Sequence, residues 1–259
     1  MEVKTLMSRV RWHASKRSVP QIRSRLLFVH IPKCAGSALT EAIARHFWSG
    51  RTTWFDVHAL ARGSALMGRP PNEMNLALTA YFLSMRQRRH FLSGHVNLSE
   101  EICDAFASEW SFVTMLRNPT SRWLSHYFYD RFKTHSGFGQ IAEDLEQFVE
   151  TEKAKRLGSL MVAQLSGRRL SDGSVGDAEI RSARRVLDHF RVVGILEDLD
   201  DFAQRFHKSL GVRLEVRQKN RSPAPANQMI NERMLARISQ LCEPDQQVYD
   251  YALHRRSIV

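Results

Sequence analysis

The sequence predicts an α/β protein with one central parallel sheet that is flanked by helices. Short apolar runs recur along the chain, and helical patterns of apolar residues follow them. Strands that alternate with helices favour a parallel sheet covered on both faces. The chain has 259 residues, 43% of them hydrophobic and 25% charged, which is ample for a sizeable core. Since no Pro/Gly/Ser-rich linker divides it, we expect one domain over residues 26–259.

The first predicted unit is a strand, a tight loop and a helix. The apolar run 26–31 has the length and composition of a buried strand. Pro32 ends it, and residues 33–37 form a turn of mostly small residues. Apolar residues at helical spacing follow this turn: Leu39, Ala42, Ile43 and Phe47.

Three further strands are predicted, over residues 90–93, 112–116 and 191–195. After the second of these, Asn118 suits a helix N-cap and Pro119 suits the first helical position. The last strand leads into a helix that Gly211 should close.

The remaining segments read as helical. Residues 139–190 are expected to form helices broken near Gly167 and Gly173, and the last 30 residues should contain a terminal helix.

Charge and cysteine content narrow the class of protein. Lys plus Arg outnumber Asp plus Glu by 38 to 27, a net charge of +11 that favours anionic partners. Residues 1–25 carry much of this excess and are interpreted as a basic, flexible arm; a transit peptide has the same composition. No apolar run is long enough for a membrane span or a signal peptide, which predicts a cytoplasmic protein. Cys34, Cys103 and Cys242 are too widely spaced for a disulfide framework or a zinc cluster.

The loop 32–37 has the properties of an anion site. It runs into a helix N-terminus, where backbone N–H groups and the helix dipole attract negative charge. Gly36 allows close approach of the backbone, Ser37 supplies a hydroxyl and Lys33 a full positive charge. The pattern differs from both the Walker A loop and G-x-G-x-x-G, and the sequence has no H-E-x-x-H or clustered Cys/His set, so no metal is expected.

A second anion site is predicted at the next strand end. Arg117 follows the strand 112–116, Ser125 lies on the helix beyond it, and Arg122 is between them. A guanidinium offers a fixed fork of donors that matches phosphate oxygens. In an open parallel sheet, ligands bind beyond the carboxyl ends of the strands, so we expect the two sites to lie at one edge of the sheet.

These two segments resemble known motifs. Residues 28–37 are similar to the 5′-phosphosulfate-binding loop of the carbohydrate sulfotransferases, and residues 116–127 to the family's 3′-phosphate-binding segment. They occur in the expected order, and weaker similarity extends over most of residues 26–254. The resemblance implies a P-loop-like sulfotransferase fold, with 3′-phosphoadenosine 5′-phosphosulfate (PAPS) as co-substrate and a hydroxyl of a carbohydrate or glycoconjugate, neutral or anionic, as acceptor.

The resemblance also implies roles for individual residues. Arg117 and Ser125 would bind the 3′-phosphate, and Ser222, in a late loop, would close over the nucleotide. His95 lies where the uronyl 2-O-sulfotransferases carry a catalytic His, although Ser93 replaces a second His of those enzymes. The 5′-phosphosulfate would be surrounded by Lys33, Ala35, Gly36, Ser37 and Ala38.

The implied mechanism uses His95 as general base and Lys33 as the charge that stabilises the leaving group. Other interpretations remain open. His95 could be a structural histidine, and a carboxylate such as Glu41 could be the base. A P-loop-type kinase would need Mg²⁺ and ATP, and a nucleic-acid-binding protein is supported only by net charge. The paired and triple arginines are interpreted as solvated surface: Arg86, Arg88, Arg89, Arg168, Arg169, Arg184 and Arg185.

Overall fold

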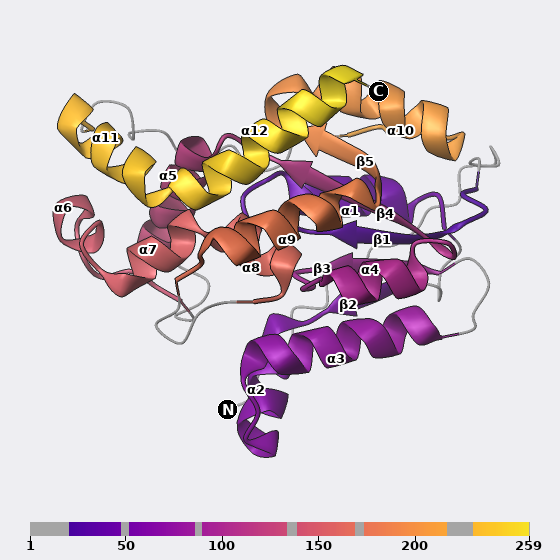
Figure 1. Cartoon of the computed structure of the whole chain (residues 1–259), viewed down its shortest axis with the longest axis horizontal. Coiled ribbons are helices and arrows are strands. Elements are labelled where there is room, and N and C mark those ends of the chain that lie inside the picture. The colour runs from indigo at the N-terminus through magenta and orange to yellow at the C-terminus, as the bar shows by residue number, and fades with distance from the viewer. Residues whose placement is uncertain are drawn as a thin grey trace.

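A five-stranded, all-parallel sheet forms the centre of the protein (Figure 1). The computed structural model describes residues 21–47, 52–85, 90–133, 139–168, 174–216 and 230–258. The order of the strands is β2-β3-β1-β4-β5. Their bounds are β1 Arg25–Val29, β2 Thr52–Phe55, β3 Phe91–Gly94, β4 Trp110–Leu116 and β5 Phe190–Ile195. The predicted α/β class is therefore confirmed, and so are the four predicted strands.

The sequence analysis missed β2, and the reason is its position. This strand is only four residues long, lies at the edge of the sheet and is half-exposed, with the exception of the more exposed Trp54. It lacks the continuous apolar run that marks a strand buried on both faces. These residues form a strand because they pair with β3.

Helices surround the sheet. On the strands β2 and β3, Ser93 contacts Thr40 of α1, while Phe55 packs against Phe82 of α3. Trp54 pairs with Ser93, so these two side chains point to the same face of the sheet, the one that α1 covers. Phe55 follows Trp54 and points to the other face, so α3 covers the face opposite α1. The helices are α1 Gly36–Ala44, α2 Val57–Met67, α3 Pro71–Ser84, α4 Glu100–Phe106, α5 Pro119–Phe132, α6 Leu145–Phe148, α7 Glu152–Gly158, α8 Leu160–Ser166, α9 Asp177–Asp188, α10 Leu199–Leu210, α11 Glu232–Leu241 and α12 Glu243–Ile258.

The predicted helix boundaries follow local capping chemistry. The Asn118 side chain accepts a hydrogen bond from the Ser121 N–H at 3.0 Å and caps α5, while Gly211 ends α10 in a left-handed conformation. The described part of the region 139–190 is largely helical as predicted and contains four separate helices, one of which ends at Gly167. The predicted break at Gly173 lies outside the described residues. The predicted terminal helix is two helices, because the chain turns at Cys242.

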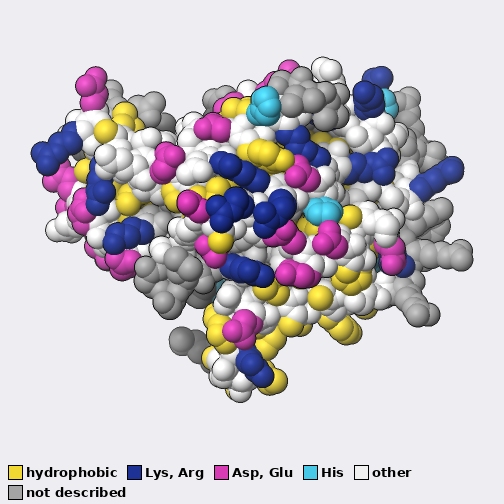
Figure 2. Space-filling model, in the orientation of Figure 1, with side chains coloured by type: hydrophobic (Ala, Val, Ile, Leu, Met, Phe, Trp, Pro, Cys, Tyr) yellow, Lys and Arg dark blue, Asp and Glu magenta, His cyan; other side chains and the backbone are white. Residues whose placement is uncertain are grey.

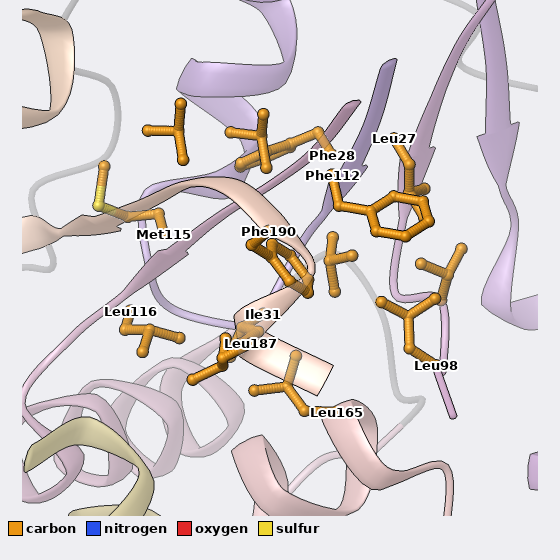
Figure 3. Packing of buried hydrophobic residues seen from close by; sticks show 14 of the residues in the cluster. Leu27, Phe28, Ile31, Leu98, Phe112, Met115, Leu116, Leu165, Leu187 and Phe190 are labelled. Atoms are coloured by element: carbon orange, nitrogen blue, oxygen red, sulfur yellow. The ribbon is translucent and has the colours of Figure 1, made fainter. Parts of the chain in front are cut away.

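The core lies on both sides of the sheet. Figure 3 shows Phe28 of β1, Phe112 of β4 and Phe190 of β5 among the aliphatic side chains that fill it. A smaller cluster packs α5 against α6, α7 and α11 around the fully buried Trp123. The start of the described chain packs into the main core around the sheet, because Ile22 is buried there and its N–H donates to the His46 carbonyl.

The surface shown in Figure 2 carries basic and acidic side chains side by side. Two of the predicted surface arginines form exposed ion pairs, Arg185 with Glu100 and Arg168 with Glu101. Such pairs contribute little to stability. Within the described ranges, no helix is both long and apolar enough to cross a bilayer.

Candidate active site

Three neighbouring strands end at the same edge of the sheet. Val29 at the end of β1 pairs with Gly94 of β3 on one side and with Thr114 of β4 on the other. The chain that follows each strand carries a predicted site residue: Lys33 after β1, His95 after β3 and Arg117 after β4. Sheet order thus brings the chain after β1 into contact with residues more than 60 positions later, since His95 contacts the His30 carbonyl and Arg117 the Lys33 carbonyl.

The loop after β1 has an unusual backbone. Lys33 and Ala35 both adopt positive φ angles, 68° and 56°, a left-handed conformation that residues other than glycine rarely take. Ala35 is the N-cap of α1, and no side chain caps this helix. The strained turn thus leaves the N-terminus of α1 without the usual polar cap, a feature that suits an external anion.

Gly36 is required by the packing of His30. A Cβ atom at Gly36 would lie 1.7 Å from Cδ2 and 2.0 Å from Nε2 of the His30 imidazole. Carbon atoms in contact are normally about 3.5–4.0 Å apart, so no side chain fits there. The sequence analysis explained Gly36 by approach of a ligand, whereas the structure adds a neighbouring histidine ring as a second reason.

Arg117 joins the two predicted anion sites. Its Nη1 donates a hydrogen bond of 3.2 Å to the carbonyl oxygen of Lys33. The guanidinium therefore lies against the loop after β1. This contact brings two cationic side chains to one strand-end region, as the sequence predicted.

Lys33 packs against an aromatic ring. Its Nζ lies 3.7 Å from the ring centroid of Tyr129 on α5, a cation–π contact. The pKa of Lys33 is lowered to about 8, mainly by burial, with smaller contributions from Arg117 and Lys133 that Asp130 opposes. At neutral pH Lys33 remains mostly charged but is poised to lose its proton under mildly alkaline conditions.

His95 is held in a defined tautomer. Its Nδ1 lies 2.6 Å from the carbonyl oxygen of His30, which can only accept, so Nδ1 carries the proton. Burial lowers the pKa of His95, and this hydrogen bond partly offsets the effect. Asn75 donates to the His95 carbonyl at 2.9 Å and fixes the main chain. The neutral imidazole therefore has its lone pair on Nε2, as a general base requires.

A pocket of about 220 Å³ lies beside this imidazole. Gly94 makes one of its walls possible, because its φ is 148° and an added Cβ would lie 2.4 Å from the Cβ of Phe55. Thr40 and Ser93 share a hydrogen bond of 2.9 Å in the same region. The pocket is lined by His30, Ser37, Thr40, Trp54, Phe55, Ser93, Gly94 and His95.

Arg122, which lies between Arg117 and Ser125 in the sequence, does not line the pocket. Its side chain is fully buried and pairs with Asp245 of α12 at 3.2 Å. It also donates to the carbonyl of Leu157. Asp245 in turn accepts from backbone N–H groups of α8. Arg122 therefore holds α5, α8 and α12 together rather than binding a ligand.

The other predicted residues fall in different places. Ser125 is half-buried in the second turn of α5, Ser37 is exposed at the start of α1, and Ala38 is buried with its N–H donating to the Ala35 carbonyl. Glu41, the rival base, forms an ion pair with Arg45 and does not line the pocket. Ser222 lies outside the described residues.

Several residues near the site escaped the sequence analysis. Trp54 and Phe55 come from the missed strand β2, and Gln164 donates to the same His30 carbonyl that orients His95. His126 of α5 has its pKa lowered to about 3, first by burial and then by Arg122, Lys33 and His95. The only sequence signal for His126 was its position within residues 116–127, the segment that resembles the 3′-phosphate-binding motif. Among the described residues, no group of three or more His, Cys, Asp or Glu side chains could hold a metal ion.

Comparison with solved structures finds similarity to the crystal structure of mouse sulfotransferase SULT7A1 complexed with PAP. The two chains share 15% sequence identity with a TM-score of 0.41, and the match covers 86% of this chain and 66% of that chain. This chain thus matches slightly less than two thirds of the length of the mouse protein. Comparison with protein-family models and with curated proteins gives no match.

Proposed function

We propose that this chain is a sulfotransferase that moves the sulfonate group of PAPS to a hydroxyl of a carbohydrate. The observation that carries the proposal is the contact of Arg117 with the Lys33 carbonyl, beside the open N-terminus of α1. It brings two cationic strand ends together, an arrangement that suits a ligand with two anionic groups. PAPS has such groups, the 5′-phosphosulfate and the 3′-phosphate.

Each predicted residue takes one role in this proposal. The loop from Lys33 to Ala38 binds the 5′-phosphosulfate through Lys33, Ala35, Gly36 and Ser37. Because the Ala38 N–H already donates within the helix, we assign Ala38 a packing role at that phosphate. Arg117 and Ser125 bind the 3′-phosphate, and Ser222 belongs to the segment that closes over the nucleotide.

Transfer follows from the two groups beside the pocket. Nε2 of His95 removes the proton of the acceptor hydroxyl, and the acceptor oxygen forms a bond to sulfur. The bond from sulfur to the 5′-phosphate oxygen breaks on the opposite side, which leaves 3′,5′-ADP. Lys33 stabilises the negative charge that grows on this oxygen, where low exposure strengthens the interaction. No step of the scheme is routed through a metal.

Calorimetry on the purified protein tests the nucleotide assignment. We expect 3′,5′-ADP to bind without Mg²⁺, and Arg117→Ala to weaken that binding by about 1.5–3 kcal/mol, the value of a hydrogen bond to a charged group. The same variant should affect 5′-AMP, which lacks the 3′-phosphate, far less. Equal losses for both ligands would refute the role of Arg117.

Two other outcomes would point to a different class of protein. Stabilisation by ATP only in the presence of Mg²⁺ would indicate a kinase, and stabilisation by an oligonucleotide at low salt would indicate a nucleic-acid-binding protein. Transfer of radiolabelled sulfonate from PAPS to a glycan panel tests the reaction itself.

A further inference from the structure

The pocket beside His95 has a distinctive lining. It lies between α1 and the ends of β2 and β3, and the Trp54 side chain of β2, which faces α1, provides its aromatic surface. The Trp54 side chain is 56% exposed, although its ring meets the edge of Phe91 at a centroid distance of 6.2 Å. A large aromatic face is therefore available to a ligand at the mouth of the pocket.

The described residues that line the pocket carry no formal charge at neutral pH. None of its eight residues is Asp, Glu, Lys or Arg. Its two histidines are neutral, because burial lowers the pKa of both, that of His30 to about 3. Lys33 and Arg117 do not line the pocket, and the proposed function assigns both to the nucleotide. A carboxylate in this pocket would lose its hydration without gaining a charged partner, which disfavours its binding.

The polar groups that remain are hydroxyls and imidazoles. Ser37, Thr40 and Ser93 supply hydroxyl groups next to the aromatic side chains. A sugar ring has matching chemistry, with apolar C–H faces and a rim of hydroxyls that require partners. The volume of about 220 Å³ is below the roughly 300–1,000 Å³ of pockets for drug-sized ligands, and so it suits a single ring.

We propose that the acceptor ring is an uncharged sugar that stacks on Trp54, with the reacting hydroxyl directed to Nε2 of His95. This inference rests on the proposed sulfotransferase function and narrows its acceptor class, because it excludes a uronate in the reacting position. Trp54 is then a specificity-determining residue that binds the acceptor and leaves the nucleotide untouched.

Matched acceptors test the charge requirement. The panel pairs methyl glycosides of neutral hexoses with the methyl glycosides of the corresponding uronic acids, which differ only in the C6 carboxylate, and adds 2-naphthol as a phenol. With PAPS as donor, kcat/KM for the best neutral glycoside should be at least about tenfold higher than for its uronate partner. A tenfold ratio corresponds to a free-energy cost of about 1.4 kcal/mol for placing the unpaired carboxylate in the pocket. Its KM should also change little with salt, since no charge pair binds it.

Variants test the stacking surface. Trp54→Ala should raise the KM for the neutral glycoside by about threefold to tenfold, the range of an aromatic contact, with kcat changed less than about twofold. Trp54→Phe should retain most of the affinity. Tyr81→Ala is the matched control, because Tyr81 is a similarly exposed aromatic residue on α3 that does not line the pocket. This variant should leave KM unchanged.

Binding of 3′,5′-ADP separates the two levels of the proposal. A protein that binds 3′,5′-ADP but prefers uronates or 2-naphthol, or transfers to no glycoside of the panel, overturns the acceptor assignment and leaves the nucleotide site intact. An unchanged KM in Trp54→Ala also overturns it. A wild-type protein that does not bind 3′,5′-ADP refutes the proposed function, and the acceptor assignment with it.

Discussion

Replacement of Gly36 by Ala tests how the loop after β1 is built. The added methyl group would lie 1.7 Å from Cδ2 of His30, about 2 Å inside normal contact, and 2.4 Å from Cγ of the same ring. Either the ring or the start of α1 must move. Overpacking of this kind typically costs about 1–3 kcal/mol. For a chain of this size, the melting temperature should fall by roughly 2–12 °C.

The same substitution should reduce catalysis. The His30 and His95 rings lie 4.4 Å apart between centroids, and the His30 carbonyl orients His95. A displaced His30 would therefore shift the proposed base or occupy the acceptor pocket. Since a misplacement of about 1 Å can cost on the order of a hundredfold in rate, we expect transfer from PAPS to fall tenfold to a hundredfold.

A double-mutant cycle with His30→Ala identifies the cause. If the clash is with the His30 ring, the double variant Gly36→Ala/His30→Ala should be more stable than the sum of the single losses by about 1 kcal/mol or more in urea denaturation. Gly63→Ala on α2 is the matched control, because no atom lies within 4 Å of its added Cβ, and it should be neutral or slightly stabilising. Single losses that add within about 0.5 kcal/mol would refute the explanation of Gly36 by His30.

Three further predictions concern the base, the leaving-group charge and the buried ion pair. His95→Ala should lower the transfer rate by about 10²–10⁴ without weakening 3′,5′-ADP binding, and the acidic limb of the wild-type pH–rate profile should lie below pH 6.5, because burial lowers the pKa and the base must be neutral. An active variant with this limb unchanged would transfer the role to a carboxylate. Lys33→Ala should reduce turnover more than 3′,5′-ADP affinity, and kcat/KM for the donor should fall as the pH rises through about 8, where Lys33 loses its charge; turnover within about threefold of wild type would contradict this. Asp245→Ala should destabilise the fold by about 3–5 kcal/mol in urea denaturation, because it leaves Arg122 buried and unpaired, and a loss below about 1 kcal/mol would show that water or another group compensates.

The sequence alone determined the features that depend on local chemistry. A continuous apolar run, the following Pro32 and a turn of small residues specify a strand and the start of a helix, because burial and backbone freedom are properties of neighbouring residues. Lys33 and Arg117 could be identified as cationic strand-end residues because each closely follows such an apolar run. Caps such as Asn118 were predictable because the capping hydrogen bond spans only three residues.

The tertiary structure decided what depends on distant partners. Arg122 lies within the predicted anion-binding segment, yet its role is set by Asp245, 123 positions away, which pairs with it in the core. Gly36 depends on where the His30 ring packs. The edge strand β2 has too weak a pattern of its own, and only pairing with β3 places Trp54 and Phe55 at the pocket. Local patterns fix where anions can bind, whereas the shape and charge of the acceptor pocket arise from side chains that only folding brings within contact distance.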